Sequence, residues 1–190
     1  MIKKITQMIS TLLLLLPGCG GKQKLYKPLK EKPKTSFYTL KSSDIHGKTV
    51  SMDTYKGKTI MVVNTASKCG YTYQYKALEK LSNDYKDTLV ILGFPSNDFL
   101  GQEPGSNQKI ENFCKIKFGV TFPLFEKIHV SGKEQSPIYQ WLTDSTKNGW
   151  NNQKPTWNFC KYIINTKGEL VAFFGSKIEP NAPEIIKLIK

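Results

Sequence analysis

The stretch VNTASKCGYTYQYKALEKL, residues 63–81, decides the fold, because an apolar strand ends within it and a helix begins. The run that enters it, residues 58–66, is apolar and rich in β-branched residues, as in a strand buried on both faces of a sheet. Beyond it, Leu78 and Leu81 recur at helical spacing on one face. Cys69 lies at the junction. Open α/β sheets place their chemistry at the carboxyl ends of strands, so this junction is a candidate functional site.

The rest of the chain continues the alternation of strands and helices. Residues 37–52 alternate in polarity and turn at His46 and Gly47, which predicts a β-hairpin. We expect, in order, a second buried strand at 88–95, a helix that carries Ile110, Phe113 and Cys114 and is closed by Gly119, a third extended segment at 121–130, a helix at 136–146, a hairpin at 161–175 and a closing helix at 183–190. This order predicts an α/β protein with a thioredoxin-like fold, in which helices flank a central mixed β-sheet and a β-hairpin lies at the N-terminal end.

Composition limits the classes of function. The 190 residues suffice for one domain with a sizeable core, and the hydrophobic content of 39% is ordinary for a globular protein. The net charge of +13 comes from lysine alone, since the sequence has no arginine. Phosphate and base recognition would be poorly served without arginine, so we expect no nucleic-acid partner. His46 and His129 belong to no Cys/His cluster, so we expect no metal and no cofactor.

The N-terminal segment has the pattern of an export signal. Two lysines precede a short apolar run and small residues, and the run is too short to span a bilayer. A short membrane or core helix is the alternative. LPGC, residues 16–19, resembles a bacterial lipobox, with a proline that is unusual at its position. The resemblance implies that residues 1–18 are removed and that Cys19 carries a lipid. We therefore expect an exported, membrane-anchored lipoprotein that faces the periplasm or the cell surface.

A lysine-rich segment follows. Residues 22–35 contain six lysines, one glutamate and two prolines, and such a stretch buries too little apolar surface to fold. We expect residues 19–36 to be a tether that is attracted to anionic lipid headgroups, and residues 37–190 to form the folded domain.

Cys69 has two interpretations from its position. A buried cysteine is commonly inert packing. A helix N-terminus, in contrast, carries partial positive charge and unpaired N–H groups, which favour a thiolate. Gln102 in the loop after the second strand, with Trp157 and Asn158 before the late hairpin, could converge on the same sheet edge. Their N–H groups donate hydrogen bonds without titrating, to a sulfur anion or to a peroxide oxygen.

Four ordered motifs resemble the glutathione peroxidase family in its cysteine form: NTASKCG, GFPSNDFLGQEPGS, FCKIKFGVTFPLFEKI and PTWNF. The resemblance runs from about Phe37 to Pro180 and implies a thiol peroxidase that reduces hydrogen peroxide and organic or lipid hydroperoxides. The catalytic tetrad of the family falls on Cys69, Gln102, Trp157 and Asn158. The family usually has cysteine and glutamine where this chain has Ser96 and Asp98, so a backup thiol at position 96 is missing.

The resemblance also implies how the oxidised cysteine is recycled. Attack of Cys69 on a hydroperoxide gives a sulfenic acid, and Cys114 occupies the place of a resolving cysteine in thioredoxin-dependent relatives. Because Cys114 falls on an apolar helix face with Ile110 and Phe113, simple core packing is the alternative. Cys160 lies two positions after Asn158 and would share its face on an extended chain. It is either a second candidate resolver or a strand residue without a redox role.

The reductant and the rival functions complete these expectations. No guanidinium is present to hold the carboxylates of glutathione, and the segment between Trp141 and Trp157 is shorter than in tetrameric relatives. We therefore expect a monomer reduced by a thioredoxin-like dithiol protein rather than by glutathione. A thiol–disulfide oxidoreductase would need a C-x-x-C motif, which Cys69 lacks, and a peroxiredoxin would have threonine where Ala66 stands. A non-catalytic binding lipoprotein on the same fold is the remaining alternative.

Overall fold

A computed structural model describes residues 23–27 and 33–189. In this part of the chain the central sheet has five strands in the order β1-β7-β6-β4-β5. Their bounds are β1 Lys24–Tyr26, β4 Thr59–Thr65, β5 Leu89–Pro95, β6 Lys161–Ile164 and β7 Leu170–Phe174. Strands β4 and β5 are parallel, and every other neighbouring pair is antiparallel. The sheet is mixed, as the sequence predicted.

Side chains of β4 and β6 alternate between two hydrophobic clusters, one on each face of the sheet. Met61 and Val63 belong to the first cluster, and Ile60 and Val62 to the second. This alternation follows from the two-residue period of a strand and explains why β4 is apolar throughout. We call the two sides the α1 face and the α3 face, after the helices that cover them.

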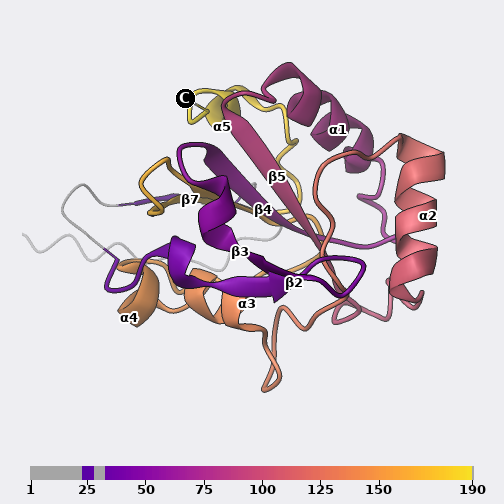
Figure 1. The fold of residues 1–190 in the computed structure, drawn as a ribbon, viewed down its shortest axis with the longest axis horizontal. Helices are drawn as coiled ribbons and strands as arrows, with labels where there is room; N and C mark the ends of the chain where they lie inside the picture. Colours follow the sequence, from indigo (N-terminus) through magenta and orange to yellow (C-terminus); the bar gives the residue numbers. More distant parts are fainter. Residues whose placement is uncertain (1–22, 28–32, 190) are drawn as a thin grey trace, which may run out of the picture.

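Helices cover both faces of the sheet (Figure 1). The α1 face packs against α1 (Gln74–Asp84), α2 (Asn107–Phe118) and α5 (Pro183–Ile186). The α3 face packs against α3 (Pro137–Leu142), and α4 (Ser145–Asn148) follows it. Helix α2 begins at a Ser106 cap, whose side chain accepts from Lys109 N, and ends at Gly119, which has a left-handed φ of 65°. Both ends follow the rules for helix termini, and the end at Gly119 was predicted from the sequence.

The predicted N-terminal hairpin is confirmed. Strands β2 (Lys41–Ser43) and β3 (Thr49–Ser51) pair antiparallel, and Gly47 takes a φ of 83° in the turn between them. Two 3-10 turns, η1 (Phe37–Thr39) and η2 (Met52–Tyr55), flank the hairpin. The chain is therefore an α/β protein with the expected central mixed sheet and flanking helices.

Three expectations require correction. Residues 24–26 were expected in an unfolded tether, but they form β1 and extend the sheet beyond β7. The extended segment 121–130 makes isolated bridges rather than a strand, through Leu124 to Gly93 and through Phe125 to Asp44. Helix α1 begins five residues after Cys69 instead of at it, and turns fill the interval.

The predictions for the N-terminal end concern residues that the structure does not describe. The predicted signal segment, residues 1–18, and Cys19 lie outside the described residues. Within residues 23–27 and 33–189, every helix is too short or too polar to cross a bilayer.

Candidate active site

Cys69 lies in the turns between β4 and α1, at the edge of the sheet where β4 ends. The residue is 8% exposed. Its backbone N–H donates to Thr72 Oγ1 at 3.0 Å, and that hydroxyl donates to Ala66 O at 2.8 Å. The N–H of Tyr71 donates to Cys69 Sγ at 3.4 Å. Thr72 thus holds the turn closed, and a backbone amide points at the sulfur.

The loop that carries Gln102 is fastened to the residues just before Cys69. Lys68 N donates to Gln102 O at 3.0 Å, and Ser67 Oγ donates to Glu103 Oε2 at 3.0 Å. Glu103 is 1% exposed. Burial raises the pKa of its carboxyl group, whereas the hydrogen bonds from Ser67 act in the opposite direction. The loop turns sharply before Gln102, where Leu100 adopts a positive φ of 51°.

Asn64 on β4 holds the segment that carries Trp157 and Asn158. Its Nδ2 donates to Trp157 O at 2.9 Å, and its Oδ1 accepts from Cys160 N at 3.0 Å. Its backbone carbonyl accepts from Phe159 N at 2.6 Å. Asn64 is fully buried, so these bonds replace its contact with water. Asn64 was not predicted as a site residue, although a polar residue within a buried strand is a sequence signal that points to it.

The two fastened segments meet through their side chains. Asn158 Nδ2 donates to Gln102 Oε1 at 3.0 Å, although the residues are 56 positions apart. The Trp157 ring lies 5.7 Å from the Phe99 ring, between centroids, and packs against the hydrophobic cluster that contains Cys69. Gln102, Trp157 and Asn158 therefore gather at one edge of the sheet, as expected. Among the described residues, the hydrogen bond to Cys69 Sγ comes from the Tyr71 backbone rather than from these side chains.

Three free thiols lie in the described residues, and the sheet separates one of them from the other two. Cys69 and Cys114 belong to the cluster on the α1 face, and Cys160 belongs to the cluster on the α3 face. Phe159 has a left-handed φ of 65°, so the chain is not extended from Asn158 to Cys160 and the expected shared face does not follow. Cys160 Sγ lies 3.5 Å from Ser176 Oγ.

The Cys114 thiol is fully buried in α2. Burial raises its pKa to about 11, with a further increase from Glu103 and an opposing effect of Tyr75. At neutral pH this buried thiol is therefore protonated, and it is a poor nucleophile while the helix stays in place.

A buried lysine supports the site and was not identified from the sequence. Lys161 on β6 has no exposed surface, and its Nζ donates to Gln74 Oε1 and to Ile178 O. Gln74 Nε2 in turn donates to Ser176 O at 2.8 Å. Burial lowers the pKa of Lys161 to about 7. The network joins β6, the first residue of α1 and the segment after β7. The sequence signal that could have identified it is a lysine inside an apolar strand pattern.

Two clefts of about 370 Å³ each lie against the segments of this site. One is lined by Gln23, Tyr71, Thr156, Trp157, Gly175, Ser176 and Lys177. The other is lined by Ser67, Lys68, Glu103, Pro104, Gly105, Lys109, Ile110 and Phe113. Because Trp157 lines the first and the Gln102 loop lines the second, small molecules could approach the site from either cleft.

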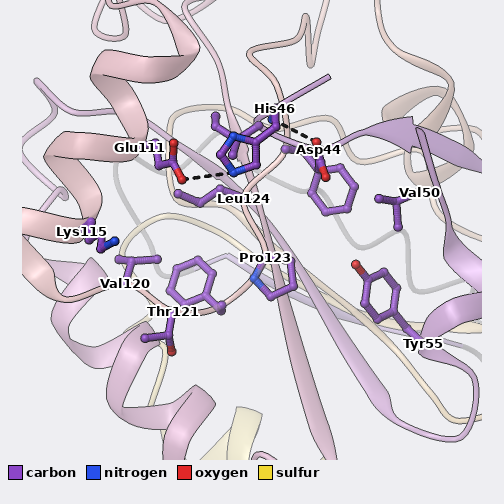
Figure 2. A pocket seen from close by; sticks show the side chains of 13 residues that line it. Asp44, His46, Val50, Tyr55, Glu111, Lys115, Val120, Thr121, Pro123 and Leu124 are labelled. Atoms are coloured by element: carbon purple, nitrogen blue, oxygen red, sulfur yellow. Dashed lines mark hydrogen bonds and ion pairs between the residues drawn. The ribbon is translucent and has the colours of Figure 1, made fainter. Parts of the chain in front are cut away.

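Each of the two histidines lies against a carboxylate. His46 Nε2 lies 3.3 Å from Glu111 Oε1, in a separate cleft of about 300 Å³ between the hairpin and α2 (Figure 2). His129 Nδ1 lies 2.7 Å from Asp98 Oδ1. Hydrogen bonds from His129 and the Val130 amide hold the Asp98 pKa below its usual value, although burial opposes this. In the described part of the chain, no three His, Cys, Asp or Glu residues are grouped for a metal ion.

Comparisons with known proteins identify relatives of the chain by sequence and by fold. A family model described as glutathione peroxidase matches residues 37–143. A glutathione peroxidase of Lactococcus lactis subsp. cremoris (strain MG1363) is 47% identical over 78% of this chain and 95% of that relative. Glutathione peroxidase-like peroxiredoxin 2 of Saccharomyces cerevisiae (strain ATCC 204508 / S288c) is 42% identical over 78% of this chain and 92% of its own. The crystal structure of Trgpx in apo form is 37% identical, with a TM-score of 0.62 over 81% of this chain and 95% of that one.

Proposed function

Because the chain belongs to the glutathione peroxidase family and is a thiol peroxidase, we propose that Cys69 is the residue that reacts with the hydroperoxide. The observation that carries the assignment is the fastening of two distant segments at the edge where Cys69 lies. Lys68, beside the cysteine, holds the backbone of Gln102, and the side chain of Gln102 accepts from Asn158. A merely packed cysteine would not require this arrangement.

In the first step the Cys69 thiolate attacks one oxygen of the peroxide. An S–O bond forms and the O–O bond breaks, so the sulfur is oxidised to a sulfenic acid and the other oxygen leaves with the electron pair. The leaving oxygen takes a proton and departs as water or alcohol. The role of Gln102, Trp157 and Asn158 is to donate N–H hydrogen bonds to the developing negative charge. Because Gln102 Oε1 accepts the hydrogen bond from Asn158, Gln102 Nε2 can serve as such a donor.

In the second step Cys114 resolves the sulfenic acid. An S–S bond forms, the S–O bond breaks, and the oxygen leaves as water. Cys114 is the better candidate than Cys160 because it lies on the same side of the sheet as Cys69. It is fully buried, so α2 must move or partly unfold before the two sulfurs meet. Exposure returns the Cys114 pKa from about 11 toward its ordinary value, which makes the thiol reactive when it is needed.

We assign the reduction of this disulfide to a thioredoxin-like dithiol protein and treat the enzyme as a monomer. The absence of arginine leaves no guanidinium for the carboxylates of glutathione. The relatives in Saccharomyces cerevisiae and Chlamydomonas reinhardtii are named peroxiredoxins, which agrees with a dithiol reductant. Attachment through Cys19 would keep the enzyme at a membrane outside the cytoplasm.

Peroxide turnover by the full chain in detergent tests the proposal. With hydrogen peroxide or an organic hydroperoxide, thioredoxin, thioredoxin reductase and NADPH, we expect NADPH consumption that Cys69→Ser abolishes. Cys114→Ser should oxidise once per chain and then stop, while Cys160→Ser should cycle like the unmodified chain. Undiminished consumption by Cys69→Ser would refute the assignment, and continued cycling by Cys114→Ser would transfer the resolving role to Cys160.

Membrane attachment is tested separately. Cys19→Ala should move the protein from the membrane fraction to the soluble fraction without changing turnover of hydrogen peroxide. An unchanged distribution between the fractions would reject the lipid anchor.

A further inference from the structure

We propose that Tyr75 takes part in the resolving step, in which its hydroxyl group donates a hydrogen bond to the sulfur of Cys114 as that thiol loses its proton. The inference rests on the proposed function, because it assumes that Cys114 attacks the sulfenic acid of Cys69. It adds to that reaction a residue outside the candidate tetrad, one that the sequence motifs did not single out.

Tyr75 lies between the turn that carries Cys69 and the helix that carries Cys114. It is the second residue of α1, and its backbone N–H donates to Thr72 O at 3.1 Å, in the turn that the Thr72 side chain closes. Its side chain is fully buried in the hydrophobic cluster on the α1 face, which also contains both cysteines. The ring packs against Phe118 of α2, with 5.3 Å between centroids. Tyr75 therefore connects the two elements that must approach each other during resolution.

In the described part of the chain, the buried hydroxyl group of Tyr75 makes no hydrogen bond. The same holds for the buried hydroxyl group of Thr65, at the end of β4. A buried polar group that lacks a partner costs stability. Phenylalanine would make the same ring contacts, with Phe118, Phe122 and Phe159, and would avoid this cost. Packing therefore explains the aromatic ring but not the hydroxyl group.

The groups around the hydroxyl indicate in which direction it donates. Burial raises the Tyr75 pKa well above its usual value, the Cys114 thiol raises it further, and Thr65 acts in the opposite direction. Conversely, Tyr75 lowers the pKa of Cys114 against the larger effect of burial. These directions are the ones expected when Thr65 donates to the phenol oxygen and the phenol donates to the sulfur. Both groups therefore lie beside the hydroxyl, although neither meets the geometry of a hydrogen bond while the thiols are reduced.

This arrangement supplies a hydrogen bond at the moment when Cys114 acquires charge. A hydrogen bond to a charged group is stronger than one to a neutral group, so the phenol stabilises the thiolate more than the thiol. Because its own pKa is raised, Tyr75 stays protonated and remains a donor. The thiolate attacks the sulfenic sulfur of Cys69: the S–S bond forms, the S–O bond breaks, and the departing hydroxide combines with the proton that the thiol released. Glu103, which also affects Cys114, raises its pKa and so opposes ionisation.

Tyr75→Phe in the full chain tests the inference, because it removes the hydroxyl group and keeps the ring. After one equivalent of hydrogen peroxide, formation of the Cys69–Cys114 disulfide at pH 7 should be about tenfold slower, the low end for loss of a hydrogen bond to a charged group. The rise in this rate with pH should move upward by about one pH unit, because one unit of pKa corresponds to a tenfold change. The preceding oxidation of Cys69 should keep its rate. Acid-quenched samples with alkylated thiols, analysed by mass spectrometry, give both rates.

Tyr139→Phe is the matched control. Tyr139 is also fully buried, and its hydroxyl group makes no hydrogen bond within the described residues, but it lies on the α3 face with Cys160. Neither variant should lower the Tm, since each removes a buried hydroxyl group without a partner. Only Tyr75→Phe should slow disulfide formation. A second variant, Thr65→Val, removes the hydroxyl group that supports the phenol and should slow the same step by a smaller factor.

Equal rates of disulfide formation in Tyr75→Phe and the unmodified chain would overturn the inference, and so would an unshifted pH dependence. Equal slowing by Tyr139→Phe would overturn it as well. A lower Tm for Tyr75→Phe together with slower oxidation of Cys69 would show that the hydroxyl group has only a structural role. Failure of the unmodified chain to form the Cys69–Cys114 disulfide would instead refute the proposed function.

Discussion

Lys161 shows how one buried charge alters the dependence of stability on pH. Its pKa falls from 10.5 to about 7 because burial removes water from the ammonium group. Between these values the unfolded chain binds a proton that the folded chain does not. The free energy of unfolding therefore rises with pH in this window, by up to about 1.4 kcal/mol per pH unit.

Replacing Lys161 by methionine tests this effect. Lys161→Met removes the titrating group, so the stability of the unmodified chain relative to the variant should increase steadily from pH 7 to pH 9. Urea unfolding at several pH values measures the difference, and the contribution of Cys114, whose pKa is raised in both proteins, cancels. Parallel stability curves for the two proteins would contradict the expectation.

At this scale the sequence suggested candidate catalytic side chains, but it did not reveal the residues that hold their segments in place. The types of side chain needed at Cys69, Gln102 and Trp157 follow from chemistry. Asn64 and Lys161 act through long-range hydrogen bonds to Cys160 N and Ile178 O, and sequence spacing does not reveal such partners. A polar side chain in a buried strand needs a hydrogen-bond partner, but its position in the sequence does not show which residue that partner is.

Helix α2 is the element whose motion the proposed mechanism requires. Its inner face buries Ile110 and Cys114, while its outer side touches the hairpin through His46 and Glu111 (Figure 2). The imidazole is 65% exposed and the carboxylate 28% exposed, so the pair contributes modestly, at most about 1 kcal/mol. Even this amount opposes detachment of the helix.

Weakening that contact should speed the resolving step. In Glu111→Gln, formation of the Cys69–Cys114 disulfide after one equivalent of peroxide should be two- to fivefold faster, which corresponds to about 0.4–1 kcal/mol. Acid-quenched samples with alkylated thiols, analysed by mass spectrometry, give the rate. Lys80→Ala is the matched control, since it removes an exposed ion pair with Asp84 on another helix. Equal rates in all three proteins would show that the contact does not restrain α2.

Most elements were predictable because their apolar periods match their environment. The segment 121–130 was not predictable in this way. Its apolar residues and β-type composition are those of a strand, but it makes only short contacts with the sheet. A side chain at Gly93 would meet Leu124 at 2.8 Å, so the absence of a Cβ is what allows this approach. β1 was missed because its stability comes from pairing with β7 and from ion pairs, and its own composition is that of a disordered linker.

At the scale of the whole molecule, β1 is an addition to the family domain. The match to the family model begins at Phe37, after β1. It covers the outer edge of β7, which would otherwise expose unpaired backbone groups. The domain should therefore fold without it, at some loss of stability.

Removal of residues 1–32 tests this expectation. The shortened chain should unfold at a Tm about 4–8 °C lower, in proportion to a loss of about 2 kcal/mol, and should keep its turnover of hydrogen peroxide. Calorimetry measures the Tm, and sedimentation would detect association through the uncovered edge. A chain that begins at Lys22 is the control, because it keeps β1. An unchanged Tm would mean that β1 contributes nothing to the domain.

The division of the thiols between the two faces of the sheet has a consequence for repair after each reaction. The three free thiols in the described part of the chain could pair in more than one way, and the wrong pair would trap the protein. Here Cys160 belongs to the hydrophobic cluster on one face of the sheet, and the other two thiols belong to the cluster on the opposite face. Under the proposed mechanism, a reductant would therefore meet one disulfide, between Cys69 and Cys114, rather than a mixture of pairings.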